Sequence, residues 1–535
     1  MKQLNYFFLI VALALVFSSC KKDTSALSDS IPTDAFAVIL FDTKSILTKA
    51  DYNPMKNKSI QDLLEKEKED NPEQIKKMEE FLKNPNSAGI DLLGNCMLYV
   101  SPETNGCLFK VNDAGKLKKT FIETLEISED ELIEEDGITI FEQGSKAALG
   151  WTKEKLLFVV HSDTYYYGDS DEDMVALLRR QLLQKSEESI NSIPSFQQFL
   201  AKKKDISVYY SYENLWSLWG PTLGGMLKYY GLNVSNIVDL FDGLYMAGFA
   251  SFEKGEIVFN QNFYFQNAEK EKKYKEFINQ IYGKITSDDL KFFTDKPLFL
   301  VSANLKGEGL YNYMNDLGVI SMIDKEFSSA LKEKNLELKS LISNFNGDFT
   351  FLFDKMEEAR NEYDYSNKVP KLALLAQLED TERTLALIES LFASNSAEIE
   401  KTKNGFQVIS EIGSIYLGIE GKSFYITNSE SLFEDIISGA TKKNDFASLA
   451  KGKHAFVYGN IHSLNQTIVE EMDTDDARLD ALVIKGLNLL GDYSFSMGDN
   501  LESSGKIEIT DRSANSLSVI CKYFDELISY IADSM

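Results

Sequence analysis

The order of sequence patterns along this chain repeats, and this repeat restricts the fold more than any other feature. A strand pattern at residues 35–40 leads into a helix start at 42–47. The same succession returns at residues 297–301 and 304–306, which lie 262 residues later. Further strands, turns and helices follow in the same order in both halves. A unit that recurs in unchanged order predicts two copies of one supersecondary arrangement.

Glycines mark the alignment of the two halves. The offset between matched segments is 268 residues near Gly150 and 248 residues near Val208. The first half therefore contains twenty extra residues, which fall around residues 165–173. Three pairs of glycines are predicted to occupy equivalent positions: Gly94 and Gly347, Gly150 and Gly418, and Gly243 and Gly491.

Short segments with alternating apolar residues dominate both halves, and residues 256–265 are the longest example. Such strands, joined by short turns and interrupted by helices, indicate antiparallel sheets with helices packed on them. We therefore predict an α+β fold of two tandem homologous domains, each an antiparallel sheet with packed helices. The predicted domains are residues 31–290 and 291–535.

The N-terminal residues have the pattern of a lipoprotein signal. Lys2 precedes an unbroken apolar run at residues 7–17, and Ser18-Ser19-Cys20 follows. Eleven apolar residues suit a signal peptide and are too few for a spanning helix. We predict a signal peptide at 1–19, a lipid on Cys20 that binds a membrane, and a polar tether up to residue 30.

Composition and motifs argue against several classes of function. The chain has 83 acidic and 56 basic side chains, and this net charge of -27 predicts no binding to nucleic acid. Only 3 histidines are present, and we expect His161, His454 and His462 at strand ends or on the surface. The segment 418–423 resembles a phosphate loop, but Tyr416 replaces its first glycine.

Acidic runs are the remaining candidates for metal binding, and they favour helix capping. Residues 169–173 and 473–476 each precede a helical pattern, where negative charge stabilises the helix N-terminus. The first run lacks the glycine and the glutamate that a calcium loop requires. We predict no catalytic residue, no metal site and no cofactor.

An aromatic cluster in the first half is the strongest candidate for a ligand site. It contains two of the three tryptophans, whereas the counterpart at residues 460–466 has no aromatic side chain. Rigid aromatic faces suit sugar rings or the side chains of a partner protein, although packing into a core is the alternative. The predicted ligand-binding residues are Tyr212, Trp216, Trp219, Tyr229 and Tyr230.

Two cysteines flank a turn at residues 101–106, so Cys96 and Cys107 are expected on adjacent strands. Centring the hairpin on the turn does not place the two sulfurs directly opposite each other. A disulfide and two buried free thiols both remain open.

Several short motifs carry a family resemblance. They are the lipobox cysteine, Ile31-Pro32 with Asp34-Ala35 and Ala37-Val38, Lys44-Ser45-Ile46-Leu47, and residues 84–91. Together they resemble a Bacteroidetes lipoprotein family that is catalogued only as a domain of unknown function. The resemblance implies a lipid-anchored cell-envelope protein, which we expect in the outer membrane, and it supplies no catalytic residue. Lys21-Lys22-Asp23 is a poor match to a surface-export signal, so the periplasmic and surface faces both remain open.

The function that we predict is a non-enzymatic binding or scaffold module, with a glycan or a protein as its partner. The alternative is an envelope hydrolase that acts on glycan or peptide. A cleft with two carboxylates about 5 to 10 Å apart would favour the hydrolase. A smooth sheet face with exposed tryptophans would favour binding. The ligand and the oligomeric state remain open.

Overall fold

The computed structural model describes residues 25–51, 85–91, 94–125, 127–142, 146–162, 173–293, 296–325, 337–359, 367–392, 399–402, 404–410, 413–463, 476–499 and 502–534, with isolated residues at 53–72 and 144. The predicted signal peptide and Cys20 lie outside these residues, as does most of the insertion predicted around residues 165–173.

The first half contains α2 (Ser25–Ser28), β1 (Ala37–Asp42), α3 (Thr43–Ala50), η2 (Pro85–Ala88), β2 (Ile90–Asp91), β3 (Asn95–Val100), β4 (Thr104–Val111), α6 (Ala114–Leu125), η3 (Glu129–Glu131), β5 (Leu132–Glu135), β6 (Ile138–Glu142), β7 (Ala147–Trp151), β8 (Lys155–His161), α7 (Met174–Leu183), η4 (Ser186–Glu188), η5 (Ile190–Ser192), α8 (Pro194–Ala201), β9 (Ile206–Ser211), α9 (Tyr212–Tyr229), α10 (Val234–Phe241), β10 (Leu244–Glu253), β11 (Glu256–Phe265) and α11 (Ala268–Ile281).

The second half contains η6 (Asp289–Phe292), β12 (Phe299–Lys306), α12 (Gly307–Asp316), α14 (Leu338–Ser343), β13 (Phe345–Ala359), β14 (Asn367–Leu378), α15 (Thr381–Phe392), β15 (Ile399–Thr402), β16 (Gly405–Ser410), β17 (Gly413–Glu420), β18 (Ser423–Thr427), α16 (Glu430–Ser438), α17 (Phe446–Ala450), β19 (Ala455–Asn460), α19 (Ala477–Leu489), β20 (Leu490–Met497), β21 (Glu502–Ile509) and α20 (Ser516–Ser534).

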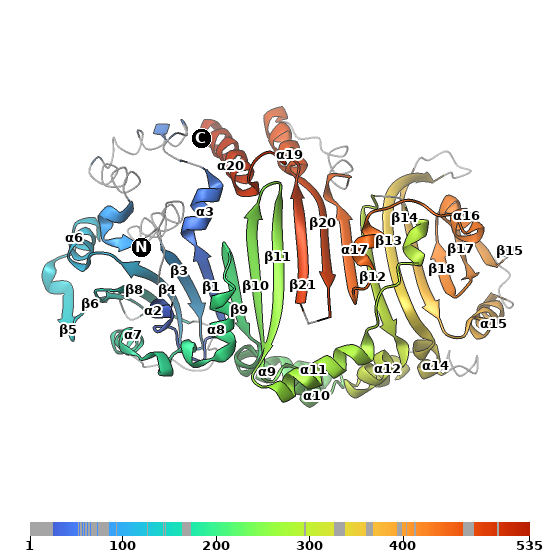
Figure 1. Ribbon diagram of the computed structural model, residues 1–535, viewed down its shortest axis with the longest axis horizontal. Coiled ribbons are helices and arrows are strands. Elements are labelled where there is room, and N and C mark those ends of the chain that lie inside the picture. Colours follow the sequence, from blue (N-terminus) through green and yellow to red (C-terminus); the bar gives the residue numbers. More distant parts are fainter. Residues whose placement is uncertain are drawn as a thin grey trace.

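The strands of each half follow one spatial order. In the first half, hydrogen-bonded neighbours run β5-β6-β7-β8-β4-β3-β1-β9-β10-β11. In the second half they run β15-β16-β17-β18-β14-β13-β12-β19-β20-β21. Because β11 pairs with β21, the two series join side by side in the middle of the molecule (Figure 1). The predicted α+β class is confirmed, whereas the homology of the two halves stays a prediction.

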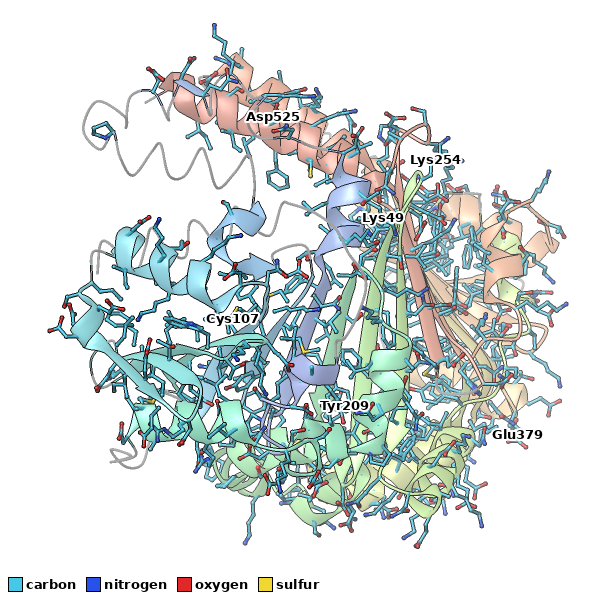
Figure 2. All side chains as sticks on the ribbon, turned by 60° about the vertical axis from the view of Figure 1, so that its left-hand side comes forward. Lys49, Cys107, Tyr209, Lys254, Glu379 and Asp525 are labelled. Carbon is cyan, nitrogen blue, oxygen red and sulfur yellow. The ribbon has the colours of Figure 1, made fainter. Side chains whose placement is uncertain are left out.

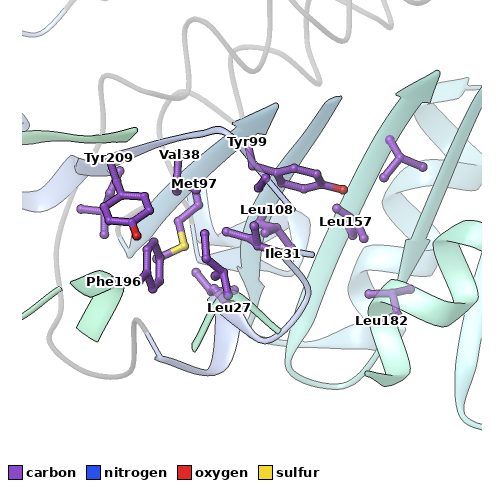
Figure 3. Packing of buried hydrophobic residues seen from close by; sticks show 14 of the residues in the cluster. Leu27, Ile31, Val38, Met97, Tyr99, Leu108, Leu157, Leu182, Phe196 and Tyr209 are labelled. Atoms are coloured by element: carbon purple, nitrogen blue, oxygen red, sulfur yellow. The ribbon is translucent and has the colours of Figure 1, made fainter. Parts of the chain in front are cut away.

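Alternation along the strands builds a core on one face of the sheet, which we call the core face. Val38 and Leu40 are fully buried there, with Tyr209 beside them and Phe196 of α8 packed against them (Figure 3). In the second half, Leu300 occupies the same face with α16 and α17. Helices that cover one face of each half explain why apolar residues recur at every second position.

The predicted tether is wrong for residues 25–30. Leu27 lies in the core of the first half, and Ser28 is fully buried with its hydroxyl donating to Asn191 Oδ1 at 2.8 Å. A single apolar residue followed by a satisfied serine is enough to dock this short segment, and so small a pattern is difficult to recognise in a polar stretch. The predicted boundary also shifts, because Ile285 and Leu290 belong to the core of the second half.

The outer strands of the sheet are covered on the opposite face as well. In the first half, Leu117 and Phe121 of α6 pack on Trp151 and its neighbours, with the rings of Phe121 and Trp151 stacked at 5.3 Å. In the second half, Ile388 of α15 packs on Phe406 in the same way. Among the residues that the structure describes, the middle strands carry no such cluster on this face, except where α20 meets them.

The last helix of each half packs on the other half. Helix α11 follows β11 and contacts α12, with the rings of Phe277 and Tyr313 at 4.7 Å. Helix α20 follows β21 and contacts α3. These two pairs lie at opposite ends of the strands (Figure 1). Figure 2 shows Lys49 on α3 beneath α20, which carries Asp525. Each half therefore completes the packing of the other.

The strand register corrects part of the sequence alignment. Leu40 and Ser302 are equivalent at the predicted offset of 262 residues, and they lie opposite Met97 and Thr350. Gly94 and Gly347 each precede these partners by three residues and are therefore equivalent. The register of β9 and β19 differs from the predicted alignment. Tyr209 lies opposite Val38, and Tyr458 lies opposite Leu300, so Tyr209 and Tyr458 are equivalent. This gives an offset of 249, one residue more than the sequence predicts.

The predicted equivalence of Gly243 and Gly491 is also displaced by one residue. Tyr245 lies opposite Ser211, whereas Asp492 lies opposite Asn460. The pairing of β20 with β21 also shifts its register between Leu490 and Tyr493.

Candidate functional site

Helix α9 carries the predicted aromatic cluster, and its first residue faces the protein. Ser211 caps the helix by accepting the N–H of Asn214 at 3.2 Å. The ring of Tyr212 stacks on Phe241 of α10 at 5.4 Å, and its hydroxyl donates to Met246 Sδ at 3.7 Å. Burial raises the pKa of Tyr212 above its ordinary value. Tyr212 therefore joins α9 to α10 and the sheet.

The middle of α9 is partly covered. Trp216 is half-buried, and a Cβ placed at Gly220 would lie 2.7 Å from the indole nitrogen of Trp216. The indole therefore lies against the helix surface that Gly220 leaves free. The side chain of Trp219 falls outside the described residues.

The end of α9 is exposed. Tyr229 is 86% exposed and Tyr230 is 58% exposed, and their rings meet edge to face at 5.5 Å. Leu223 and Met226 are exposed on the turns that precede them.

The structure does not bring the five predicted ligand residues together. Tyr212 and Tyr229 begin and end a helix of 18 residues, which separates them by about 26 Å along its axis. Among those of the five whose side chains are described, only Tyr229 and Tyr230 form an exposed pair.

A second surface, which the sequence did not reveal, crosses the middle strands on the opposite face. Neighbouring strands place one apolar residue or glycine beside the next across nine strands. We call this the central apolar row, and its residues are Phe41, Ile206, Ala250, Phe259, Gly505, Phe495, Val457, Val301 and Phe351. At a strand spacing of about 4.8 Å, the row is about 38 Å long.

The centre of this row is exposed. Phe259 is 37% exposed and Phe495 is 39% exposed, and Gly505 separates them on the strand between. A Cβ at Gly505 would lie 3.0 Å from the Phe495 ring, so the glycine leaves room for that ring. All other members of the row are partly exposed. The sequence signal for this surface is the continuous apolar run 455–458, which places apolar residues on both faces of β19.

Comparison with protein families adds one match. A family model described as a domain of unknown function (DUF4836) matches residues 28–517. The chain belongs to the DUF4836 family. The matched range covers most of both halves and contains the whole central apolar row of this DUF4836 chain. No curated protein and no solved structure matches the chain.

The polar cluster that most resembles a catalytic centre lies in the second half of the DUF4836 domain. Asp348 is buried and accepts hydrogen bonds from Thr286, Ser287 and Asn304 at 2.6–3.1 Å. Asp289 is also buried and accepts from Ser423 at 2.7 Å and from Gln377 at 3.2 Å. These bonds hold the connection that leads into β12.

The ionisation of this cluster reflects its burial. Burial raises the pKa of Asp289 to about 6, although the bond from Ser423 lowers it. His454 was expected at a strand end or on the surface, and it lies directly before β19 but is buried. Burial lowers the pKa of His454, whose Nδ1 lies 2.6 Å from the carbonyl oxygen of Gly283. Asp289, Asp348 and His454 therefore stabilise the fold of the connecting segment.

Among the described residues, no group of three or more histidine, cysteine or acidic side chains could hold a metal ion. The acidic run at 473–475 falls outside them, while Asp476 caps α19 by accepting two backbone N–H groups. Within the described ranges, no helix is long and apolar enough to cross a bilayer.

Proposed function

We propose that this protein is a lipid-anchored, non-enzymatic binding module of the cell envelope, and that its central apolar row receives apolar side chains of a partner protein. The lipid is proposed on Cys20, after the apolar run 7–17. The proposal also places the DUF4836 chain among the Bacteroidetes lipoproteins that its N-terminal motifs resemble, with the outer membrane as its location.

One observation carries the binding proposal: two phenylalanines lie exposed in the middle of a sheet face. Phe259 and Phe495 flank Gly505, and half-buried apolar residues extend the surface on both sides. An exposed contiguous apolar surface is characteristic of interaction sites. Burial of apolar area stabilises a complex by about 25 cal/mol for each square ångström, and this free energy would provide the affinity.

The chemistry of the row favours a protein over a glycan. Sugar hydroxyls need hydrogen-bonding groups beside an aromatic face, whereas the members of the row contribute apolar side chains and one glycine. Gln261 and Ser503 lie in the next row of the same face, and Ser503 is buried. Apolar side chains of a partner therefore fit this surface better than a sugar ring.

The apolar dye Nile red tests the row without a known partner. The double variant Phe259→Ser and Phe495→Ser should lose most of the dye fluorescence of the folded protein. Phe524→Ser is the matched control, because Phe524 is 53% exposed on α20 and is not a member of the row. Equal fluorescence in the double variant and the parent, at the same melting temperature, would overturn the proposed site.

Lipid anchoring is tested separately. Cys20→Ala should move the protein from the detergent-extracted membrane fraction to the soluble fraction, because the lipid has no attachment site. A variant that remains in the membrane fraction would contradict the anchor but leave the dye result intact.

A further inference from the structure

The end of α9, together with its C-cap Tyr230, forms an exposed apolar tip, defined by Leu223, Met226, Tyr229 and Tyr230. Glycines surround these residues, and a Cβ at Gly225 or Gly231 would meet no heavy atom within 4 Å. The two tyrosines are therefore the most prominent side chains of this surface.

The tip lies in a segment with very little charge. Residues 214–238 contain a single charged side chain, Lys228, in a chain of which 26% of residues are charged. The net charge of the whole chain is -27. An acidic surface is repelled by anionic lipids, whereas this segment contributes one positive charge and no negative charge.

The tip is held in place by hydrogen bonds to the second half. The N–H of Asn233 donates to the carbonyl oxygen of Leu317 at 2.9 Å. Asn236 donates through its side chain to the carbonyl oxygen of Asp316 at 2.8 Å. Within the tip, the N–H of Leu232 donates to Leu227 at 3.0 Å. These bonds fix the tyrosines on a built surface.

The base of α9 lies beside the N-terminal segment. The side-chain amide of Asn214 donates to the carbonyl oxygens of Ala35 at 3.2 Å and Thr33 at 3.4 Å. Cys20 precedes Ser25, the first described residue, by five positions, which reach at most about 17 Å. From Asn214, the helix extends about 24 Å to Tyr230. A lipid on Cys20 would therefore keep the tip within reach of the bilayer.

We propose that this tip inserts into the membrane interface and forms a second contact beside the lipid on Cys20. The inference rests on the proposed lipid anchor, which supplies the high local concentration that a small surface needs. Tyrosine suits this role, because its ring enters the apolar boundary while its hydroxyl stays among the headgroups. Two contacts fix the orientation of the protein, whereas one lipid leaves it free to rotate.

The test uses the mature chain, residues 20–535, with Cys20→Ser so that no lipid contributes. Vesicles of phosphatidylethanolamine and phosphatidylglycerol are the probe, and co-sedimentation gives the ratio of bound to free protein. The double variant Tyr229→Ser and Tyr230→Ser should lower this ratio about tenfold or more. The control, Phe524→Ser with Ile531→Ser, removes two exposed side chains of α20 and should leave the ratio unchanged.

A second measurement locates the tip directly. Tyr229→Trp should be quenched by lipids with brominated acyl chains, whereas Phe524→Trp should not, relative to the parent tryptophans. Equal vesicle binding by the tyrosine double variant would overturn the inference. A concentration-dependent dimer that disappears in that variant would also overturn it, because the tip would then be a contact between copies. Neither result depends on lipidation, which the Cys20→Ala fractionation tests by itself.

Discussion

The two halves place different chemistry at one backbone position. In the first half, the N–H of Asp42 donates to the carbonyl oxygen of Asp205, and in the second half the N–H of Asn304 donates to that of His454. Asp205 and His454 therefore directly precede strands at equivalent places in the two halves, β9 and β19, and both side chains are buried. Asp205 bonds Lys49 at 2.8 Å, whereas His454 bonds Gly283. Backbone pairing fixes the position, and the side chain is free to differ.

On the sheet face opposite the core face, equivalent positions of the two halves also carry different residues. Ile39, Val208 and Gly248 lie side by side in the first half. Their counterparts in the second half are Val301, Val457 and Phe495. A Cβ at Gly248 would meet no heavy atom within 4 Å, whereas Phe495 fills the equivalent place. The apolar surface is therefore deeper in the first half and raised in the second.

The largest expected effect separates Asp205 from His454. Asp205→Ala would remove one of the two acidic partners of Lys49, the other being Glu253, and leave the hydroxyl of Ser45 and the N–H of Phe252 without their acceptor. Loss of one partner of a buried ion pair should lower the free energy of unfolding by about 3 kcal/mol. His454→Ala loses a neutral bond and should cost about 1–2 kcal/mol. Urea unfolding measures both.

The double variant Asp205→Ala and Lys49→Met is the control for this comparison. If the ion pair stabilises the fold, the double variant should lose less free energy of unfolding than the sum of the losses in the two single variants. Burial lowers the pKa of Lys49, but the bonds and charges of Asp205 and Glu253 outweigh burial and raise it overall. Additive costs, or a larger cost at His454, would contradict the comparison.

The second prediction concerns the segments that lead into the first strand of each half. In the first half, neutral Ser28 bonds Asn191, whereas in the second half acidic Asp289 bonds Ser423. The pKa of Asp289 rises from 3.8 to about 6 through burial, so the folded protein holds its proton more tightly. The stability that this proton provides is present below about pH 3.8 and is lost as pH rises through about 6.

Asp289→Asn should therefore be more stable than the parent at pH 7, by about 1–3 kcal/mol, and similar to it at pH 4. Urea unfolding at the two pH values gives the difference. His454 acts in the opposite direction, because its pKa is lowered and its stabilisation is lost as pH falls. A variant that is less stable at pH 7 would show that the charged Asp289 is stabilised by its bonds.

Much of the architecture could be predicted from local patterns. Alternating strands and intervening helices established the α+β class, and the match of Gly94 with Gly347 agrees with the strand register. Local patterns did not predict the strand register to the exact residue. The offset of β19 is 249 rather than 248, and a shift of one residue changes the face on which a side chain lies.

The central apolar row could not be predicted, because it depends on which strands are neighbours. Phe259 and Gly505 are opposite each other through the pairing of β11 with β21, although they are far apart in the sequence. No local pattern specifies such a pairing. The aromatic cluster shows the converse, because Tyr212 and Tyr229 are close in sequence but lie at opposite ends of α9.

The third prediction exchanges the residues that distinguish the two apolar surfaces. Phe495→Gly should lower the free energy of unfolding by about 1–2 kcal/mol, because it removes a partly buried ring from a strand. Gly248→Phe should change stability by about 0.5 kcal/mol or less, because the space above Gly248 is open. Thermal unfolding measures both variants. A large loss for Gly248→Phe would mean that another part of the chain occupies that space in solution.

The smallest expected effect is at a pair of thiols that only the first half possesses. Cys96 and Cys107 occupy the positions of Phe349 and Leu374, as the pairings of β3 and β13 with their neighbours show. The two Sγ atoms are 4.0 Å apart, about 2 Å further than a disulfide bond requires. Cys96 is buried, and its bond to Cys107 together with burial raises its pKa well above the ordinary value.

A raised pKa leaves little thiolate, so Cys96 should react slowly with oxidants. We expect alkylation under denaturing conditions without reductant to label Cys96, Cys107 and Cys521 completely. In the folded protein, Cys107 should react before Cys96, because Cys107 is only partly buried. Mass spectrometry of tryptic peptides distinguishes the sites, with Cys107→Ser as the control for the assignment. Labelling of Cys521 alone, restored to all three by reductant, would show that the first half closes this pair as a disulfide where the second half packs two apolar side chains.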